Sequence, residues 1–190
     1  HFTGISSAKS LEYIRRAKEG GIGITCSVTP QHMYFTDEDL RDYDTNLKSD
    51  PPFRSVNDRN ALREAVLNGT IDCITTHHIP QDWDNKVCEF EYAKPGMIGL
   101  ESAFGVLGTL DIPLGTIIDC LSSNPRTIFN LPSSTINEGN VADLTVYLPG
   151  DAYTFNESLI RSRSKNSPYY GKELKGMVAG TILGNKSFFN

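Results

Sequence analysis

Several features that would assign this chain of 190 residues to a common functional class are missing from its sequence. No apolar run approaches the roughly 20 residues of a membrane-spanning helix, and no charged and then apolar signal segment opens the chain, so we expect no membrane partner. The formal net charge of −5 leaves no excess of basic residues for binding a nucleic acid. These absences leave small molecules and other proteins as the expected partners.

Paired cysteines are also absent. The cysteines never occur as Cys-x-x-Cys, which argues against a zinc knuckle. Most of them lie inside apolar runs, which is typical of buried thiols in a reducing compartment, and we therefore expect a cytoplasmic protein. They are Cys26, Cys73, Cys88 and Cys120.

The chain has neither an initiator methionine nor a polar lead-in. Residues 1–6 instead have the composition of the interior of a strand. We therefore expect the sequence to be a piece of a longer protein.

Apolar patterning predicts three strand-and-helix units in the first part of the chain. Short β-branched stretches predict strands over residues 2–5, 22–28 and 71–75. Apolar residues recur at helical spacing over residues 11–17 and 58–68. Strands and helices in this order predict an α/β fold whose parallel sheet is connected by right-handed crossovers.

The composition changes towards the carboxyl end. From residue 133 the chain is rich in Ser, Thr, Asn and Gly, and residues 141–148 and 177–183 predict antiparallel strands. We therefore expect an α/β region over residues 1–132 and a β extension over residues 133–190. The α/β region is expected to end in helices over residues 97–110, 117–121 and 125–129.

The segment at 76–86 carries a specific motif. It reads Thr-His-His-Ile-Pro-Gln and, after four further residues, Lys. This motif resembles the second signature of the dihydroorotases, whose usual wording is roughly Ala-Thr-Asp-His-Ala-Pro-His, four residues, Lys. Thr76, His78, Pro80 and Lys86 match that signature.

Other phrases of the dihydroorotases follow in the same order. Residues 44–54 resemble the loop Asn-Phe-Lys-x-Asn-Pro-Pro-Leu-Arg, and carboxy-terminal phrases are matched at 122–126, 136–144 and 164–176. The resemblance covers the whole chain, but only against roughly the second half of a family member.

The resemblance implies a fold and a chemistry. Dihydroorotases are (β/α)8 metal-dependent hydrolase barrels with a small β-sandwich, and they interconvert carbamoyl aspartate and dihydroorotate in pyrimidine biosynthesis, with zinc as the family cofactor. In these terms residues 1–132 would form barrel strands six to eight with their helices, and residues 133–190 would contribute to a composite sandwich domain. Such a reaction needs metal to acidify a bridging water and a group that passes the proton to the leaving nitrogen.

The sequence departs from the family at two positions of the metal site. When residues 5–10 are aligned with the family motif, Gly4 stands where strand six supplies a histidine ligand, and His1 falls on an earlier histidine that is not a ligand. A register shifted by three residues would instead make His1 the ligand. His77, our candidate catalytic residue, stands where the family has a metal-binding, proton-shuttling aspartate. An imidazole can bind zinc and carry a proton, so an altered ligand, a shuttle and a purely structural histidine all remain open.

The expected substrate contacts are mixed as well. Asn46 and Gly96 match positions that dihydroorotases use for the pyrimidine ring, through a side chain and the backbone respectively. Gln81 replaces a substrate-binding histidine, so it would recognise an anionic substrate without a charge-assisted hydrogen bond, or act only as a solvated loop residue. His32 is expected to be a core or supporting histidine rather than a ligand.

Two functions are compatible with these departures. The first is a dihydroorotase homologue whose zinc is absent or weakly bound and whose catalysis is impaired or lost. Its expected partners are the missing amino-terminal half of the same protein, a second copy in a homo-oligomer, and aspartate transcarbamoylase, as the resemblance implies for inactive relatives. The second is an active cyclic amidohydrolase, acting on dihydroorotate, allantoin or a hydantoin, that uses His77 in place of the family aspartate.

Overall fold

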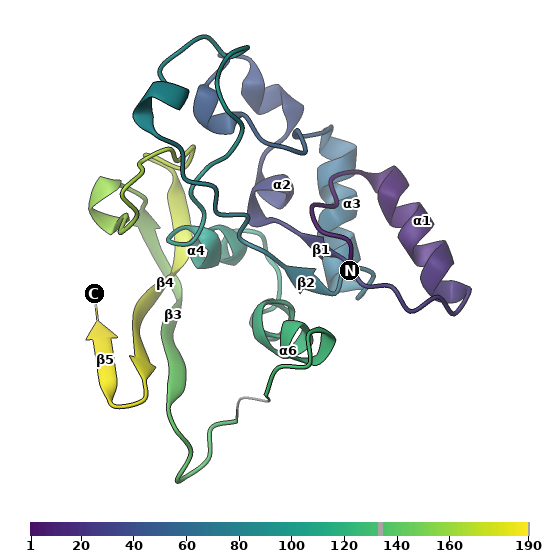
Figure 1. Ribbon diagram of the computed structural model, residues 1–190, viewed down its shortest axis with the longest axis vertical. Helices are drawn as coiled ribbons and strands as arrows, with labels where there is room; N and C mark the ends of the chain where they lie inside the picture. The colour runs from purple at the N-terminus through teal and green to yellow at the C-terminus, as the bar shows by residue number, and fades with distance from the viewer. Residues whose placement is uncertain (133–134, 190) are drawn as a thin grey trace.

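The computed structural model describes residues 1–132 and 135–189 (Figure 1). Three extended segments lie parallel in the order in which they occur along the chain. Phe2 bridges Cys26, and Ser27–Val28 (β1) pairs in register with Cys73–Ile74 (β2). The first pairing is continued by the Ile5 N–H, which donates to the Ser27 carbonyl at 3.1 Å. The predicted parallel arrangement is therefore confirmed, although the strands are shorter than the apolar runs that predicted them.

Two long helices, Ala8–Glu19 (α1) and Val56–Leu67 (α3), pack against each other beside this sheet (Figure 1). Each begins at a serine, because the side chains of Ser7 and Ser55 accept backbone N–H groups of the first turn. The Asp58 carboxylate joins the two helices by accepting the Ala8 N–H at 2.9 Å. The short helical segments between and after them are Pro30–Tyr34 (α2), Asp37–Leu40 (η1), Thr45–Leu47 (η2) and Trp83–Asn85 (η3).

The predicted helix over residues 97–110 is wrong in its first half. Helix Ala103–Gly108 (α4) begins six residues later, because Met97 forms a parallel bridge with His78 and the Ile98 N–H donates to the Asn166 carbonyl. The two helices expected over residues 117–121 and 125–129 form one continuous helical run with a π turn in its middle. That run comprises Leu114–Ile118 (α5), Asp119–Ser123 (η4) and Asn124–Ile128 (α6).

The β extension is an antiparallel sheet of Asp143–Thr154 (β3), Glu173–Leu183 (β4) and Lys186–Phe189 (β5), in that order (Figure 1). The sequence predicted the first two strands but missed β5 and the full length of β3. The short helix Glu157–Leu159 (η5) lies in the connection between β3 and β4. Helix α4 packs directly on β4, and a Cβ at Gly108 would collide with the Lys175 carbonyl oxygen.

One of the two hydrophobic clusters spans both expected regions. It brings Phe155, Tyr169 and Leu174 together with Phe35 and Val106, all of them buried. The division at residues 132 and 133 stays a prediction, since residues 133 and 134 lie outside the described part of the chain. No helix in the part that the structure describes is long and apolar enough to cross a membrane.

Candidate functional site

The loops that leave the carboxyl ends of the parallel segments carry the expected metal-site positions. Gly4 lies near the end of the first segment, and His77 follows β2. His1 lies at the opposite end, where its Nδ1 is 2.7 Å from Oγ1 of Thr25, a residue that precedes β1. The geometry therefore separates His1 from the site and gives no support to the shifted register.

Gly4 offers no metal donor, and its backbone resists one. Its φ of +71° is in the left-handed region, where a side chain is strained. A Cβ at this position would lie 3.4 Å from the Pro51 side chain. A histidine there would meet backbone strain, while its Cβ would be in ordinary van der Waals contact with Pro51.

His78 connects the loop after β2 to the segment before α4. Its Nδ1 accepts the backbone N–H groups of Gly99 at 3.1 Å and Leu100 at 3.3 Å. Because both neighbours donate, Nδ1 must be unprotonated and the ring proton of the neutral form must be on Nε2. The matched histidine of the motif therefore holds two stretches of backbone together.

His77, unlike His78, has a ring with no hydrogen-bond partner among the described residues. It has a φ of +46°, which is uncommon for a residue with a side chain. The structure shows no hydrogen bond from its ring to any described residue, and the side chain is only half-buried. Its imidazole is thus the one expected metal-site group that remains free to bind or to carry a proton.

His32 is buried and fully occupied by its neighbours. Its Nε2 lies 2.9 Å from the Pro51 carbonyl oxygen and its Nδ1 2.6 Å from Oγ1 of Thr29. A carbonyl only accepts, so Nε2 carries the proton and Nδ1 accepts the threonine hydroxyl. Burial, together with nearby His77, lowers the pKa of His32 to about 4, so the ring is neutral near pH 7. The expectation of a supporting histidine agrees with this geometry.

The donor set does not fit a zinc ion by itself. Zinc sites in proteins take three or four Cys, His or carboxylate ligands. No group of three or more such residues gathers in the described ranges 1–132 and 135–189. At the carboxyl ends of the strands, His77 is the candidate ligand whose ring makes no hydrogen bond to a described residue.

Two of the expected substrate residues lie together at a cavity of about 780 Å³. Asn46 and Gln81 line it with Lys86 and residues 162–166. Gln81 is engaged by its own loop, because its Nε2 donates to the Pro95 carbonyl at 2.9 Å.

Gly96, the third expected substrate contact, is not among the residues that line this cavity. Its N–H donates to the Lys48 carbonyl at 2.8 Å, and its carbonyl accepts Nδ2 of Asn166 at 3.1 Å. The backbone groups expected to meet a substrate are therefore used within the fold. The substrate roles of Asn46, Gln81 and Gly96 stay predictions.

Two lysines join the loops around the cavity. Nζ of Lys86 is buried and donates to the carbonyls of Thr45 and Lys94, each at 2.8 Å. Nζ of Lys48 donates in the other direction, to the carbonyls of Phe90 at 2.8 Å and Glu91 at 2.9 Å. We call Lys48 and Lys86 the lysine clasp. Burial lowers the pKa of the Lys86 ammonium to about 8.

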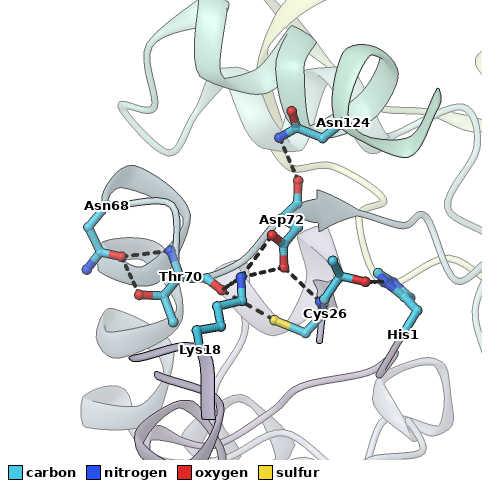
Figure 2. A network of polar contacts seen from close by, with 8 residues as sticks. His1, Lys18, Cys26, Asn68, Thr70, Asp72 and Asn124 are labelled. Carbon is cyan, nitrogen blue, oxygen red and sulfur yellow. Dashed lines mark hydrogen bonds and ion pairs between the residues drawn. The ribbon is translucent and has the colours of Figure 1, made fainter. Parts of the chain in front are cut away.

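The amino ends of the strands are held by a second polar network (Figure 2). The Asp72 carboxylate accepts Nζ of Lys18 at 2.7 Å and the Cys26 N–H at 2.8 Å. The Asp72 carbonyl accepts Nδ2 of Asn124 at 2.8 Å, and Figure 2 shows these groups converging from α1, both strands and α6. The network lies at the opposite end of the strands from His77, so we assign it a structural role.

Comparison with known proteins shows what this chain is similar to. No family model matches the chain. The dihydroorotase of Geobacter metallireducens is 39% identical over 192 residues, covering 98% of this chain and 45% of that protein. The dihydroorotase of Caldanaerobacter subterraneus is 42% identical over 188 residues, covering 96% and 43%. The chain is a homologue of the dihydroorotases. It spans less than half the length of these relatives.

Solved structures support the fold of this dihydroorotase homologue. The L-hydantoinase of Arthrobacter aurescens superposes with a TM-score of 0.86 at 23% identity, over 97% of this chain and 43% of that one. A D-hydantoinase superposes with a TM-score of 0.87 at 22% identity, over 99% and 44%. The chain is therefore an α/β fragment that matches part of the hydantoinase fold, which confirms that much of the predicted fold class.

The motifs of the dihydroorotase homologue predicted which residues belong to the candidate site, but not which contacts surround them. Lys86 was singled out because it matches the motif, but nothing in the sequence indicated that it forms a clasp with Lys48. The ties of His78 to residues 99 and 100 also depend on contacts that form only when separate segments fold together.

Proposed function

We propose that the chain is the carboxy-terminal part of a dihydroorotase-family protein of pyrimidine biosynthesis whose metal-dependent catalysis is impaired or lost. The observation that carries this proposal is Gly4. It stands at a family ligand position, has no donor atom, and has a left-handed backbone next to Pro51.

The neighbouring histidines do not replace the missing ligand. Both ring nitrogens of His32 are occupied, and Nδ1 of His78 accepts two backbone N–H groups. Loss of a residue that merely supports a ligand commonly costs about 10–100-fold in metal affinity, and loss of the ligand itself should cost more. Zinc, the cofactor of the family, would therefore be absent or weakly held.

The fold proposal extends the same resemblance. Residues 1–132 would be strands six to eight of a (β/α)8 barrel, and residues 133–190 part of a composite sandwich domain. The barrel would be completed by an amino-terminal half like the one that the relatives contain. Aspartate transcarbamoylase and a second copy of the chain are the further partners that we propose.

One observation favours the alternative of an active cyclic amidohydrolase. His77 lies three residues after β2 and its imidazole makes no hydrogen bond to a described residue, so it is available as a metal ligand or proton carrier. Under this alternative the substrate would be dihydroorotate or another cyclic amide such as allantoin or a hydantoin.

Metal analysis and a dihydroorotate hydrolysis assay of the full-length protein separate the two proposals. We expect less than one zinc per chain, no turnover above background, and no further change in His77→Ala. His1→Ala is the matched control, because it removes a histidine at the other end of the strands. Two metals per chain, with turnover that disappears in His77→Ala but not in His1→Ala, would establish the active enzyme.

A further inference from the structure

Two loops at one end of the molecule carry aromatic side chains flanked by carboxylates. The sequences are Asp-Tyr-Asp at 42–44, Asp-Trp-Asp at 82–84 and Glu-Phe-Glu-Tyr at 89–92. We call these three segments the acidic-aromatic rim. Tyr43 is 71% exposed, Trp83 72% and Tyr92 73%, so three large rings face solvent. Aromatic side chains of this size are usually covered by the fold or by a partner.

Two segments of the rim, 42–44 and 89–92, are in direct contact, and segment 82–84 belongs to the same loop as 89–92. The rings of Tyr43 and Phe90 meet edge to face, with centroids 5.9 Å apart. The lysine clasp holds the same two loops through their backbone carbonyls, and Figure 1 shows both loops at the end of the molecule away from β5. A surface that is already ordered loses little conformational freedom on binding.

The negative charge of the rim is only partly offset within the part of the chain that the structure describes, through the attraction between Asp44 and the Lys86 ammonium. Its six carboxylates are exposed, and none of them forms an ion pair with a side chain in the described ranges. The clasp lysines are directed at carbonyl oxygens instead. Arg163 and Lys165 line the adjoining cavity without pairing with the rim.

We propose that the acidic-aromatic rim is the docking surface for a protein partner that presents arginine side chains. A guanidinium can stack on an exposed ring while donating two parallel hydrogen bonds to a flanking carboxylate. The rim repeats this pairing of ring and carboxylate in all three segments. Tyrosine and tryptophan are also the side chains that most often dominate binding energy at interfaces.

Aspartate transcarbamoylase is the first probe, and this choice alone rests on the proposed function. Binding to the full-length protein is measured by sedimentation velocity at two salt concentrations. We expect at least 10-fold weaker binding in Trp83→Ala and in the double variant Asp82→Asn with Asp84→Asn. Tyr13→Ala, a 59% exposed tyrosine on α1, is the matched control and should bind as wild type does. Equal binding by wild type and rim variants would refute the rim as the docking surface, although aspartate transcarbamoylase would remain a partner.

A peptide of alternating arginine and glycine is the second probe, and it decides the matter if aspartate transcarbamoylase does not bind at all. We expect it to bind the full-length protein at least fivefold more tightly than the matched lysine peptide, and to lose this preference in Trp83→Ala. If aspartate transcarbamoylase does not bind but the arginine peptide does, only that partner is refuted. If the arginine peptide binds no more tightly than the lysine peptide, the rim is refuted as a docking surface for arginine side chains.

Discussion

Gly96 shows how a single residue can be required by both its backbone and its surroundings. Its φ is +128°, and a Cβ there would lie 2.5 Å from Cγ2 of Ile79. Strain and overpacking each cost about 1–3 kcal/mol, so we expect Gly96→Ala to lower the free energy of unfolding by about 2–6 kcal/mol in denaturant titrations.

The matched control for Gly96→Ala is Gly171→Ala. Gly171 has a φ of +72° but open space around its Cα, so only the backbone cost of about 1 kcal/mol applies. Equal losses in the two variants would show that contact with Ile79 is not what requires glycine at position 96.

His32 predicts an acid-sensitive contribution to stability. Its pKa falls from 6.5 in the unfolded chain to about 4 in the fold, chiefly through burial. The unfolded state therefore binds more protons between these values, and stability is complete above about pH 6.5 and lost as pH falls towards 4. The full shift corresponds to about 3 kcal/mol.

Urea unfolding at pH 7 and pH 4.5 tests this contribution. The loss of stability between the two values should be smaller in His32→Gln than in wild type by about 2 kcal/mol, since glutamine does not titrate. His1→Gln is the control, because His1 is exposed and should leave the wild-type pH dependence intact. An unchanged pH dependence in His32→Gln would contradict a buried neutral histidine.

Single residues also show which features of the candidate site could be predicted from the sequence. The motif singled out His77, His78 and Lys86 because these residues lie close together in the sequence at the spacing of the dihydroorotase signature. It could not reveal that His78 is bound to residues 99 and 100, or that Gly4 faces Pro51, because those contacts join segments far apart in sequence.

At the scale of elements, the Asp72 network tests how the helices are joined to the sheet. Asp72 and Lys18 are about four-fifths and three-quarters buried. We expect Asp72→Asn to cost about 1–3 kcal/mol, because the ion pair is lost and the amide has one oxygen acceptor for both the Lys18 ammonium and the Cys26 N–H.

The exposed pair of Arg15 and Glu19 on the same helix provides the control for Asp72→Asn. Glu19→Gln should change the unfolding free energy by less than about 0.5 kcal/mol. A comparable loss in both variants would mean that Asp72 is no more than a surface charge.

The lysine clasp predicts how rigid the loop at 81–95 is. Lys86→Met would leave the carbonyls of Thr45 and Lys94 without their donor, and unmade buried hydrogen bonds favour local opening. We expect chymotrypsin to cleave next to the aromatic residues of this loop at least fivefold faster in Lys86→Met. Lys94→Met, at an exposed side chain, should be cleaved at the wild-type rate.

Elements were predicted well where one physical signal dominated. Helices α1 and α3 have serine caps and apolar residues at helical spacing, and both were found within two or three residues. Residues 97–99 were wrongly assigned to a helix because a short apolar run looks alike in a helix and a buried strand. Strand β5 was missed because all of its residues are exposed and it has no alternation of buried and exposed positions.

At the scale of the whole molecule, the apolar edges decide what the chain can do alone. Within the described ranges the first parallel segment has a backbone partner on one side only, at β1. Phe2 is 56% exposed beside that edge, and Phe188 is 61% exposed at the edge of the other sheet. Open edges with apolar side chains favour pairing with another chain.

We therefore predict that residues 1–190 do not persist as a monomer. Sedimentation velocity of the isolated chain should show self-association that increases with concentration, and coexpression with the amino-terminal half that we propose should convert it to a discrete complex. Added zinc should change neither result, because Gly4 has no donor and metal stabilises a fold only where deprotonated ligands converge. Phe2→Lys is the edge variant, since a charge there blocks pairing, and Tyr13→Lys is its control on α1. A stable monomer that binds zinc stoichiometrically would contradict both the open edge and the missing ligand.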